Sequence, residues 1–226
     1  MNKDELKKKA AEKAVEYIKS GMVVGLGTGS TTKFAIEKIG DLINRGELKN
    51  IAAIPTSIAS EKLARELKIP LTDFSRETRI DITIDGADEV DRNLNLIKGG
   101  GGALLREKIV AQATEREIII VDETKISVQL GEKWAVPIEV IKFAAGLETE
   151  YLKSIGGKPV LREVNGRPFV TDEGNYILDT NFGILKNPEL LAEMLNERAG
   201  IVEHGLFIGL AAKVIVAKPE GIVELE

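Results

Sequence analysis

Residues 80–108 have the sequence IDITIDGADEVDRNLNLIKGGGGALLREK. The segment begins with the alternating isoleucines of a strand, continues through an acidic turn and four consecutive glycines, and ends in a helical pattern. An ordered glycine costs about 0.5 to 1 kcal/mol of extra chain entropy, so stability alone does not favour the run at 99–102. We therefore expect another group to approach this backbone closely, as in an active site at the end of a strand of an α/β protein.

Strands and helices alternate through the first half of the chain. The sequence predicts strands at 22–26, 51–54, 69–74, 80–85 and 117–122 and helices at 3–20, 31–44, 57–67 and 102–114. This alternation indicates parallel strands joined by right-handed crossovers. We therefore predict an α/β fold with a doubly wound, mostly parallel, Rossmann-like sheet.

The pattern changes after about residue 131. The sequence predicts strands at 135–141, 159–164, 169–171, 176–179 and 201–207, helices at 145–155 and 188–199, and a hairpin turn at Asn165-Gly166. This order approximates the β-α-β-β-α-β succession of a ferredoxin-like unit, and a strand at 213–217 then returns to the main sheet. We predict a Rossmann-like catalytic domain of residues 1–130 plus 208–226 and an inserted α+β domain of residues 131–207.

Composition limits the class of function. The chain has 226 residues, of which 43% are hydrophobic and 30% charged, as in an ordinary globular protein. A formal net charge of -5 argues against nucleic acid as a partner. No apolar stretch approaches the roughly 20 residues needed to cross a bilayer, and the N-terminal segment lacks the apolar core of a signal peptide. We expect a cytoplasmic protein without nucleic-acid or membrane partners.

The inventory of metal ligands and nucleophiles is small. The chain has no cysteine, and its one histidine is His204. A thiolate metal site, a zinc cluster or a Ser-His relay therefore has almost nothing to be built from. We predict no metal site and a structural role for His204.

A glycine-rich turn, GLGTGSTT at 25–32, lies between a predicted strand and a predicted helix. Helix N-terminal amides and hydroxyl groups in such a turn suit an anion such as a phosphate monoester. A dinucleotide fingerprint would need a glycine where Ser30 stands, and a Walker loop would need a Gly-Lys-Ser/Thr ending. The alternative is an ordinary helix start capped by Ser30 or Thr31.

Three charged residues are candidates for chemistry. The predicted strand delivers Asp85 to the carboxyl edge of the sheet, where α/β proteins bind ligands, although Asp-Gly is also common in turns. Lys98, beside the amides of the glycine run, can stabilise a developing oxyanion. Glu107 lies near the apolar stripe of its helix, and a buried carboxyl group with a raised pKa suits a general base. A surface glutamate is the alternative for position 107.

In order and spacing, these motifs resemble the type A family of ribose-5-phosphate isomerases. The resemblance covers nearly the whole chain and rests on DELKK at 4–8, GTGST at 27–31, DGADE at 85–89, KGGGGALLREK at 98–108 and VDETK at 121–125. The family usually has three glycines followed by alanine, whereas Gly102 lengthens the run here.

The resemblance implies an aldose-ketose isomerase of the pentose phosphate pathway that interconverts ribose 5-phosphate and ribulose 5-phosphate without a metal or organic cofactor. Glu107 would be the catalytic base, and Lys98 would stabilise the enediolate. Asp85, assisted by Lys98 or Asp88, would move the proton during ring opening. The resemblance also implies a homodimer or homotetramer.

The same resemblance implies which residues bind the substrate, with the phosphate at residues 28–31. They are Lys7, Thr28, Gly29, Ser30, Thr31, Asp85, Gly86, Ala87, Asp88, Lys98, Gly99, Gly100, Gly101 and Lys125. Without the resemblance, Lys7 and Lys125 would be taken for surface residues. The alternatives from other classes are a sugar-phosphate-sensing regulatory domain, a nicotinamide-dependent oxidoreductase and a coenzyme A transferase with a catalytic glutamate.

Overall fold

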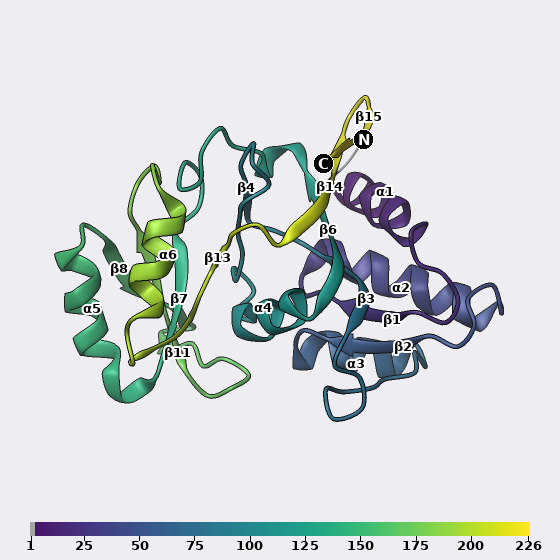
Figure 1. Cartoon of the computed structure of the whole chain (residues 1–226), viewed down its shortest axis with the longest axis horizontal. Helices are drawn as coiled ribbons and strands as arrows, with labels where there is room; N and C mark the ends of the chain where they lie inside the picture. The colour runs from purple at the N-terminus through teal and green to yellow at the C-terminus, as the bar shows by residue number, and fades with distance from the viewer. Residues whose placement is uncertain (1–2) are drawn as a thin grey trace. The chain divides into compact units, whose positions relative to one another are not determined.

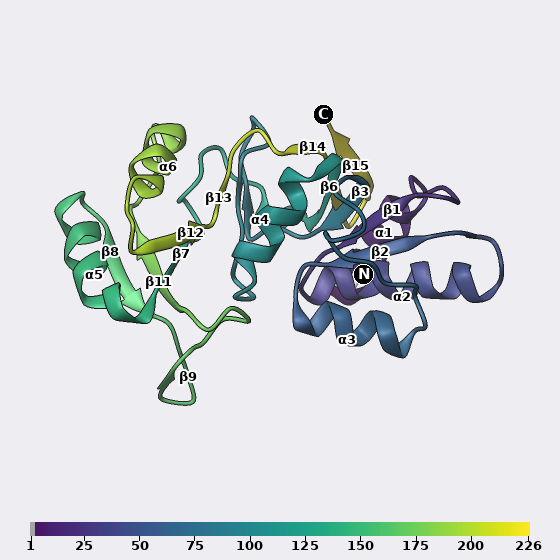
Figure 2. The same ribbon diagram turned by 60° about the horizontal axis from the view of Figure 1, so that its bottom comes forward.

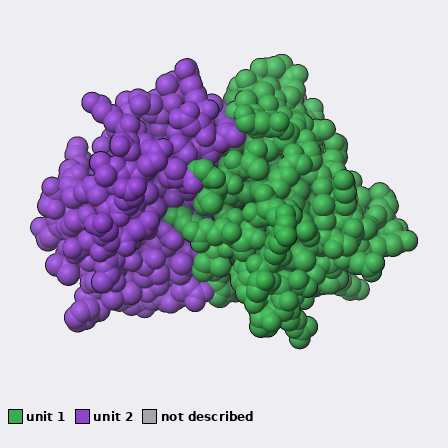
Figure 3. Space-filling view, in the orientation of Figure 1, with its two compact units in different colours: residues 1–87, 106–125, 209–226 green, residues 88–105, 126–208 purple. Residues whose placement is uncertain are grey.

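A computed structural model describes residues 3–226 and divides them into two compact units (Figures 1 and 3). Unit 1 contains the described residues up to 87 together with 106–125 and 209–226, and unit 2 contains 88–105 and 126–208. The predicted domains differ from these units chiefly in residues 88–105, which the prediction assigned to the catalytic domain. The division into domains 1–130 plus 208–226 and 131–207 stays a prediction.

Unit 1 is built on a six-stranded sheet in the order β15-β14-β6-β3-β1-β2. The strands are β1 (Val23–Leu26), β2 (Ala52–Pro55), β3 (Ile80–Asp85), β6 (Thr114–Asp122), β14 (Ala211–Lys218) and β15 (Gly221–Leu225). All neighbouring strands are parallel except β14 and β15, which pair antiparallel. The predicted mostly parallel, Rossmann-like sheet is confirmed, although β15 was not predicted.

Helices cover both faces of this sheet (Figure 2). They are α1 (Lys3–Val15), α2 (Ser30–Asn44), α3 (Ile58–Glu66) and α4 (Leu104–Gln112). The first three share one apolar cluster with Ala53 of β2, whereas Val110 of α4 packs with Ile54 in a second cluster. Since successive residues of a strand point to opposite faces, α4 lies on the other face of the sheet. The sheet is therefore doubly wound, as predicted.

Several predicted elements of unit 1 differ from the structure. The helix predicted at 102–114 ends at Gln112, and the next strand begins at Thr114 rather than at 117. The strand predicted at 69–74 is wrong, because the chain pairs with β2 only at an isolated bridge between Leu71 and Ala53. Pro70 has no amide hydrogen to extend that pairing, and Asp73 turns the chain by accepting a hydrogen bond from the Ser75 amide at 2.9 Å. The first helix ends at Val15 rather than at residue 20.

Unit 2 contains a four-stranded antiparallel sheet in the order β12-β7-β11-β8. Its elements in chain order are β7 (Val136–Val140), α5 (Ala145–Ser154), β8 (Lys158–Leu161), β11 (Tyr176–Asn181), α6 (Pro188–Asn196) and β12 (Ile201–His204). A short η2 helix (Lys142–Ala144) precedes α5. The predicted β-α-β-β-α-β succession of a ferredoxin-like unit is therefore confirmed.

The predicted hairpin of unit 2 is present with a shifted second strand. Strands β9 (Glu163–Val164) and β10 (Arg167–Pro168) pair across Asn165 and Gly166, whose φ angles of 54° and 73° are both positive, as a type I′ turn requires. The strand predicted at 169–171 is wrong, because the pairing falls on residues 167–168.

The strand predicted at 201–207 is two strands. β12 pairs with β7, whereas β13 (Leu206–Phe207) pairs with β5 (Leu96–Ile97), which also pairs with β4 (Glu89–Val90). The chain changes partner at Gly205, where a Cβ atom would lie 2.3 Å from the carbonyl oxygen of Lys98. His204 is buried just before this break, and its Nδ1 accepts a hydrogen bond from the Leu206 amide at 3.3 Å, consistent with the predicted structural role.

A buried carboxyl group lies in the sheet of unit 2. Glu139 of β7 is 1% exposed, and its Oε1 accepts hydrogen bonds from Thr171 Oγ1 at 2.8 Å and Asn175 Nδ2 at 2.9 Å. Burial raises the pKa of Glu139 above its ordinary value, and the two hydrogen bonds offset only part of that effect. The folded protein therefore binds this proton more tightly than the unfolded chain does, and stability falls as pH rises from the unfolded to the folded pKa.

We expect Glu139→Gln to remove this pH dependence. One amide oxygen can accept both hydrogen bonds and carries no charge to desolvate, so at pH 8 the variant should melt at or a few degrees above the wild-type temperature, since 1 kcal/mol corresponds to about 2–4 °C for a chain of this size. Near pH 4 the two proteins should melt alike. Circular dichroism melts measure the difference, with Glu139→Ala as the control that loses both hydrogen bonds. If Glu139→Gln were less stable than the wild type by the same amount at both pH values, the raised pKa of Glu139 would be contradicted.

Candidate functional site

The glycine-rich turn after β1 joins β1 to α2 at the carboxyl edge of the unit 1 sheet. The Gly27 amide donates to the carbonyl of Ile84 at 3.0 Å, and a Cβ atom at Gly27 would lie 2.2 Å from Asp85 Oδ1. Gly29 has a φ of 119° and precedes α2 without a side-chain cap. The alternative of a cap by Ser30 or Thr31 is therefore wrong, and the anion site expected at this helix start stays a prediction.

Hydroxyl groups surround the side chain of Thr28. Its Oγ1 lies 2.7 Å from Thr56 Oγ1 and 2.8 Å from Ser57 Oγ, and both partners follow β2. Sequence reasoning missed Thr56 and Ser57. The signal was a pair of hydroxyl residues at the end of the second strand, where a dinucleotide-binding protein would carry an acidic residue.

A cation from α1 reaches the start of α2. The Nζ of Lys7 donates to Ser30 Oγ at 2.9 Å, and the Lys7 side chain is only 14% exposed. Lys7 is therefore not the ordinary surface residue that its sequence context indicates. The structure brings this charge to the segment that the family resemblance assigns to the phosphate.

Asp85 ends β3 and is buried. Its Oδ1 accepts hydrogen bonds from the Thr28 amide at 3.0 Å and the Gly86 amide at 2.7 Å. One carboxylate oxygen therefore ties the turn after β1 to the turn after β3. Gly86 and Ala87 follow as partly buried residues of that second turn.

Glu107 lies in the first turn of α4 and is 4% exposed, so the alternative of a surface glutamate is wrong. Lys108 is also buried, which the helical spacing did not predict. Lys125 is partly buried at the end of η1 (Glu123–Lys125), directly after β6. Glu107 and Lys125 thus belong to unit 1, on two separate elements.

Unit 2 holds Lys98 and the glycine turn that follows it. Lys98 is 1% exposed, and its Nζ lies 5.4 Å from the centroid of the Phe207 ring. The Gly102 amide donates to the carbonyl of Gly99 at 2.9 Å, which closes a turn over 99–102. A lysine held this deeply presents its charge in one place, which suits electrostatic stabilisation.

Asp88 is bonded to the same turn. Its Oδ2 accepts a hydrogen bond from the Gly100 amide at 2.7 Å, and a Cβ atom at Gly100 would lie 2.6 Å from Asp88 Oδ1. A side chain at 100 would displace this carboxylate, so a group approaches the backbone closely here, as the density of glycines predicted. Gly101 is exposed at the tip of the turn.

The predicted residues thus fall into groups that the structure brings together within each unit. Lys7 meets Ser30, and Thr28 meets Asp85 in unit 1, while Asp88 meets the glycine turn next to Lys98 in unit 2. Over residues 3–226, the structure contains no group of three or more histidine, aspartate and glutamate side chains placed to hold a metal ion. In that same range no helix is long and apolar enough to span a membrane.

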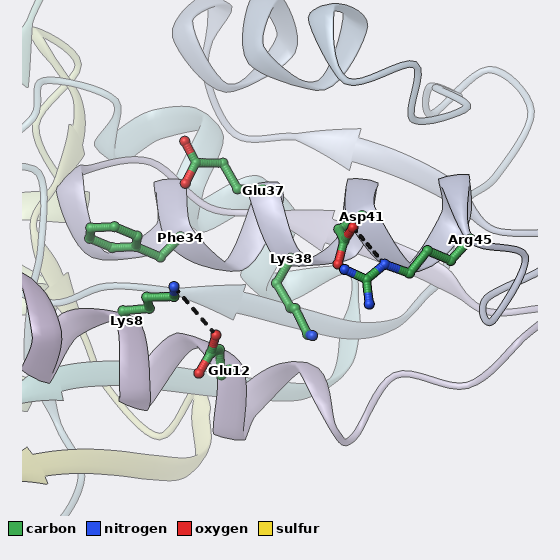
Figure 4. A pocket seen from close by; sticks show the side chains of 7 residues that line it. All are labelled: Lys8, Glu12, Phe34, Glu37, Lys38, Asp41 and Arg45. Carbon is green, nitrogen blue, oxygen red and sulfur yellow. Dashed lines mark ion pairs between the residues drawn. The ribbon is translucent and has the colours of Figure 1, made fainter.

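A surface groove of about 320 Å³ lies elsewhere on unit 1, between α1 and α2 (Figure 4). It is lined by Lys8, Glu12, Phe34, Glu37, Lys38, Asp41 and Arg45. Two ion pairs lie along its sides, Lys8 with Glu12 at 4.0 Å on α1 and Arg45 with Asp41 at 2.9 Å at the end of α2 (Figure 4). None of the predicted site residues lines it, and the balanced charges do not favour an anionic ligand.

A doubly wound sheet with charged groups at its carboxyl edge is the arrangement of α/β enzymes that act on small ligands by acid-base chemistry. The family model described as "Ribose 5-phosphate isomerase A (phosphoriboisomerase A)" matches residues 52–221. The chain therefore belongs to the ribose 5-phosphate isomerase A family.

Relatives and solved structures agree with this membership. A ribose-5-phosphate isomerase A of Desulfatibacillum aliphaticivorans is 57% identical over 226 residues, which cover 100% of this chain and 98% of that protein. A solved D-ribose-5-phosphate isomerase in complex with phospho-erythronic acid has a TM-score of 0.97 at 43% identity and matches over 100% of both chains. The ribose 5-phosphate isomerase from Plasmodium falciparum has a TM-score of 0.96 at 43% identity, covering 99% of this chain and 98% of its own. The predicted family and fold class are confirmed.

We expect Gly27→Ala to destabilise the protein by about 1–3 kcal/mol, the usual cost of forcing extra atoms into a packed interior. The new Cβ would lie 2.6 Å from the backbone Cα of Asp85, so a side-chain rotation cannot relieve the clash. Gly146→Ala in α5 is the matched control, because a Cβ there meets nothing within 4 Å. Chemical denaturation compares the two variants, and a Gly27→Ala protein as stable as Gly146→Ala would refute the close approach.

Proposed function

We propose that this chain interconverts D-ribose 5-phosphate and D-ribulose 5-phosphate through an enediolate intermediate, as an aldose-ketose isomerase of the non-oxidative pentose phosphate pathway. The observation that carries the proposal is the whole-chain likeness to ribose-5-phosphate isomerases. The phospho-erythronic acid bound to one solved relative is a phosphorylated sugar acid. Its carboxylate and phosphate resemble the charged groups of the proposed intermediate.

Residues 28–31 form the phosphate subsite in this proposal. The support is the start of α2, where the amides have no side-chain cap and the helix dipole favours an anion. Lys7 adds a cation beside Ser30. Thr56 and Ser57 orient the Thr28 hydroxyl, so the subsite is preorganised before the substrate arrives.

Asp85 catalyses opening of the sugar ring, with Lys98 or Asp88 assisting. It moves a proton between the ring oxygen and the anomeric hydroxyl group. The two amides that bind Asp85 Oδ1 support this role, because they hold the carboxylate in one orientation. Gly86, Ala87 and Lys125 contact the sugar phosphate in the same scheme.

Glu107 is the base for the isomerisation itself. It removes the proton from C2 of the open-chain aldose and returns it to C1, so one carboxylate serves as base and then as acid. Burial of Glu107 supports this role, because a carboxylate shielded from water is the stronger base. Lys98 with the adjacent loop amides stabilises the enediolate oxygen, a contribution of about 3–4 kcal/mol for a well-placed donor.

The proposed reaction needs neither a metal nor an organic cofactor, because the carboxylate and the lysine together supply proton transfer and charge stabilisation.

We place the enzyme in the cytoplasm as a homodimer or homotetramer, with no nucleic-acid or membrane partner. Exposed apolar side chains on unit 2 support self-association, with Phe143 at 98% and Leu147 at 65% exposure. Analytical ultracentrifugation measures the oligomeric state, and cell fractionation measures the location. A monomer at micromolar concentration would contradict the proposed oligomer.

A coupled assay with ribose 5-phosphate in the presence of EDTA tests substrate, reaction and metal independence together. The proposal expects turnover that EDTA does not change. Binding of the sugar phosphate without turnover would instead favour a sensing protein and overturn the proposal.

Glu107→Gln should lower kcat by about 10²–10⁴-fold, the usual contribution of a general base. Substrate affinity should change only modestly, because the amide keeps the shape of the side chain. Stopped-assay kinetics and calorimetric titration with ribose 5-phosphate measure the two quantities. Glu66→Gln, on the exposed side of α3, is the matched control. Activity that survives in Glu107→Gln would place the base elsewhere.

A further inference from the structure

Arg162 of unit 2 contacts the glycine turn directly. Its Nη1 donates to the carbonyl oxygens of Gly99 at 2.9 Å and Gly100 at 3.2 Å. The Arg162 backbone is fixed as well, because its amide donates to Ile177 at 2.9 Å and its carbonyl accepts from the Phe169 amide at 2.8 Å. The sequence analysis assigned no role to this residue.

Asp179 of β11 orients the guanidinium group. Arg162 Nε donates to Asp179 Oδ2 at 2.8 Å, and Nη2 donates to Oδ1 at 2.5 Å. This paired geometry is the strongest that an arginine and a carboxylate form, and the Arg162 side chain is only 14% exposed. The carboxylate binds two of the guanidinium nitrogens, so the third is aimed at the glycine turn.

The contacts fix two successive peptide planes. In a trans peptide the C=O and N–H groups point in opposite directions. The carbonyls of Gly99 and Gly100 both point to Arg162 Nη1, so the N–H groups of Gly100 and Gly101 point away from it. The Gly100 amide meets Asp88 Oδ2 on that far side, and the Gly101 amide belongs to the next peptide, whose carbonyl is also held by Arg162.

Phe169 holds the end of the same turn. Gly102 has a φ of 82°, and a Cβ atom there would lie 2.4 Å from the Phe169 ring. The guanidinium carbon of Arg162 lies 5.8 Å from the centroid of this ring. Arg162 and Phe169 therefore restrain the turn together, and the Phe169 ring leaves no room for a side chain at 102.

We propose that Arg162, held by Asp179, is a positioning residue for the isomerisation. It orients the peptide group between Gly100 and Gly101 so that the Gly101 amide stabilises the oxyanion that develops on the substrate, while the Gly100 amide stays bonded to Asp88. The inference rests on the proposed function, because the turn is assigned there to the enediolate. Arg162 itself acts through the turn and does not touch the substrate.

The test compares Arg162→Met with Arg167→Met. Both variants remove one arginine from the same hairpin region, and Arg167 is exposed on β10. We expect Arg162→Met to lower kcat roughly 10- to 100-fold, the effect of misplacing preorganised groups. KM for ribose 5-phosphate should change less than about threefold, since the phosphate subsite carries most of the binding. Arg167→Met should keep wild-type kinetics.

Two further measurements separate positioning from a general loss of structure. Inhibition by phospho-erythronic acid should weaken by a factor close to the loss in kcat, because its carboxylate uses the same donors as the intermediate. Hydrogen exchange of the Gly100–Gly102 segment should quicken in Arg162→Met while the rest of unit 2 is unchanged. Asp179→Asn should give a smaller loss in the same direction.

The outcomes distinguish this inference from the proposed function. A wild-type protein that does not isomerise ribose 5-phosphate overturns the proposed function. An active wild type with an Arg162→Met variant of equal kcat overturns the positioning role alone. An equal fall of kcat in Arg167→Met, or a change confined to KM, also overturns it.

Discussion

The hydrogen bond from the Thr28 amide to Asp85 joins the two turns that carry the candidate site residues of unit 1. It forms only because β1 approaches β3 without side chains between them. Gly27 leaves room for Asp85, and Gly25 leaves room for Thr83, whose Oγ1 would lie 2.0 Å from an added Cβ. The entropy lost in ordering two glycines is thus the cost of placing an acidic group beside the start of α2.

Unit 2 uses the same physical device with different partners. A carboxylate binds an amide of the glycine turn, and a guanidinium group binds two of its carbonyls. Peptide dipoles held by fixed charges need no reorganisation when charge develops on a substrate, which is why such groups contribute strongly to catalysis. In both units a charged side chain approaches the backbone at a glycine, Asp85 at Gly27 and Asp88 at Gly100.

The larger elements were predictable because their residues repeat with the period of a helix or a strand. The alternating isoleucines of β3 locate that strand to the residue, and Ser57 marks the start of α3 by capping it. Strands such as β4 and β13 have two residues each and carry no pattern. Both strands form by pairing with β5, and a pairing with another segment cannot be recognised from two residues alone.

The candidate site was predictable where its residues are neighbours in the sequence and not where they meet only in the fold. Motifs that sit in one turn, such as Asp85 with Gly86, can be recognised from neighbouring residues alone. Lys7 and Ser30 are far apart in the sequence, and only the packing of α1 against α2 makes their contact. The burial of Glu107 likewise depends on what packs against α4, because its neighbours in the sequence are charged.

The parallel pairing of β14 with β6 has a consequence for how this protein forms on the ribosome. Residues 126–208 are synthesised between the two strands and belong to unit 2. The sheet of unit 1 therefore stays incomplete until that entire stretch has left the exit tunnel, and the exposed edge of β6 is a hazard for premature association during this time. A nascent chain stalled before β14 is accordingly a natural client for a chaperone that shields open strand edges.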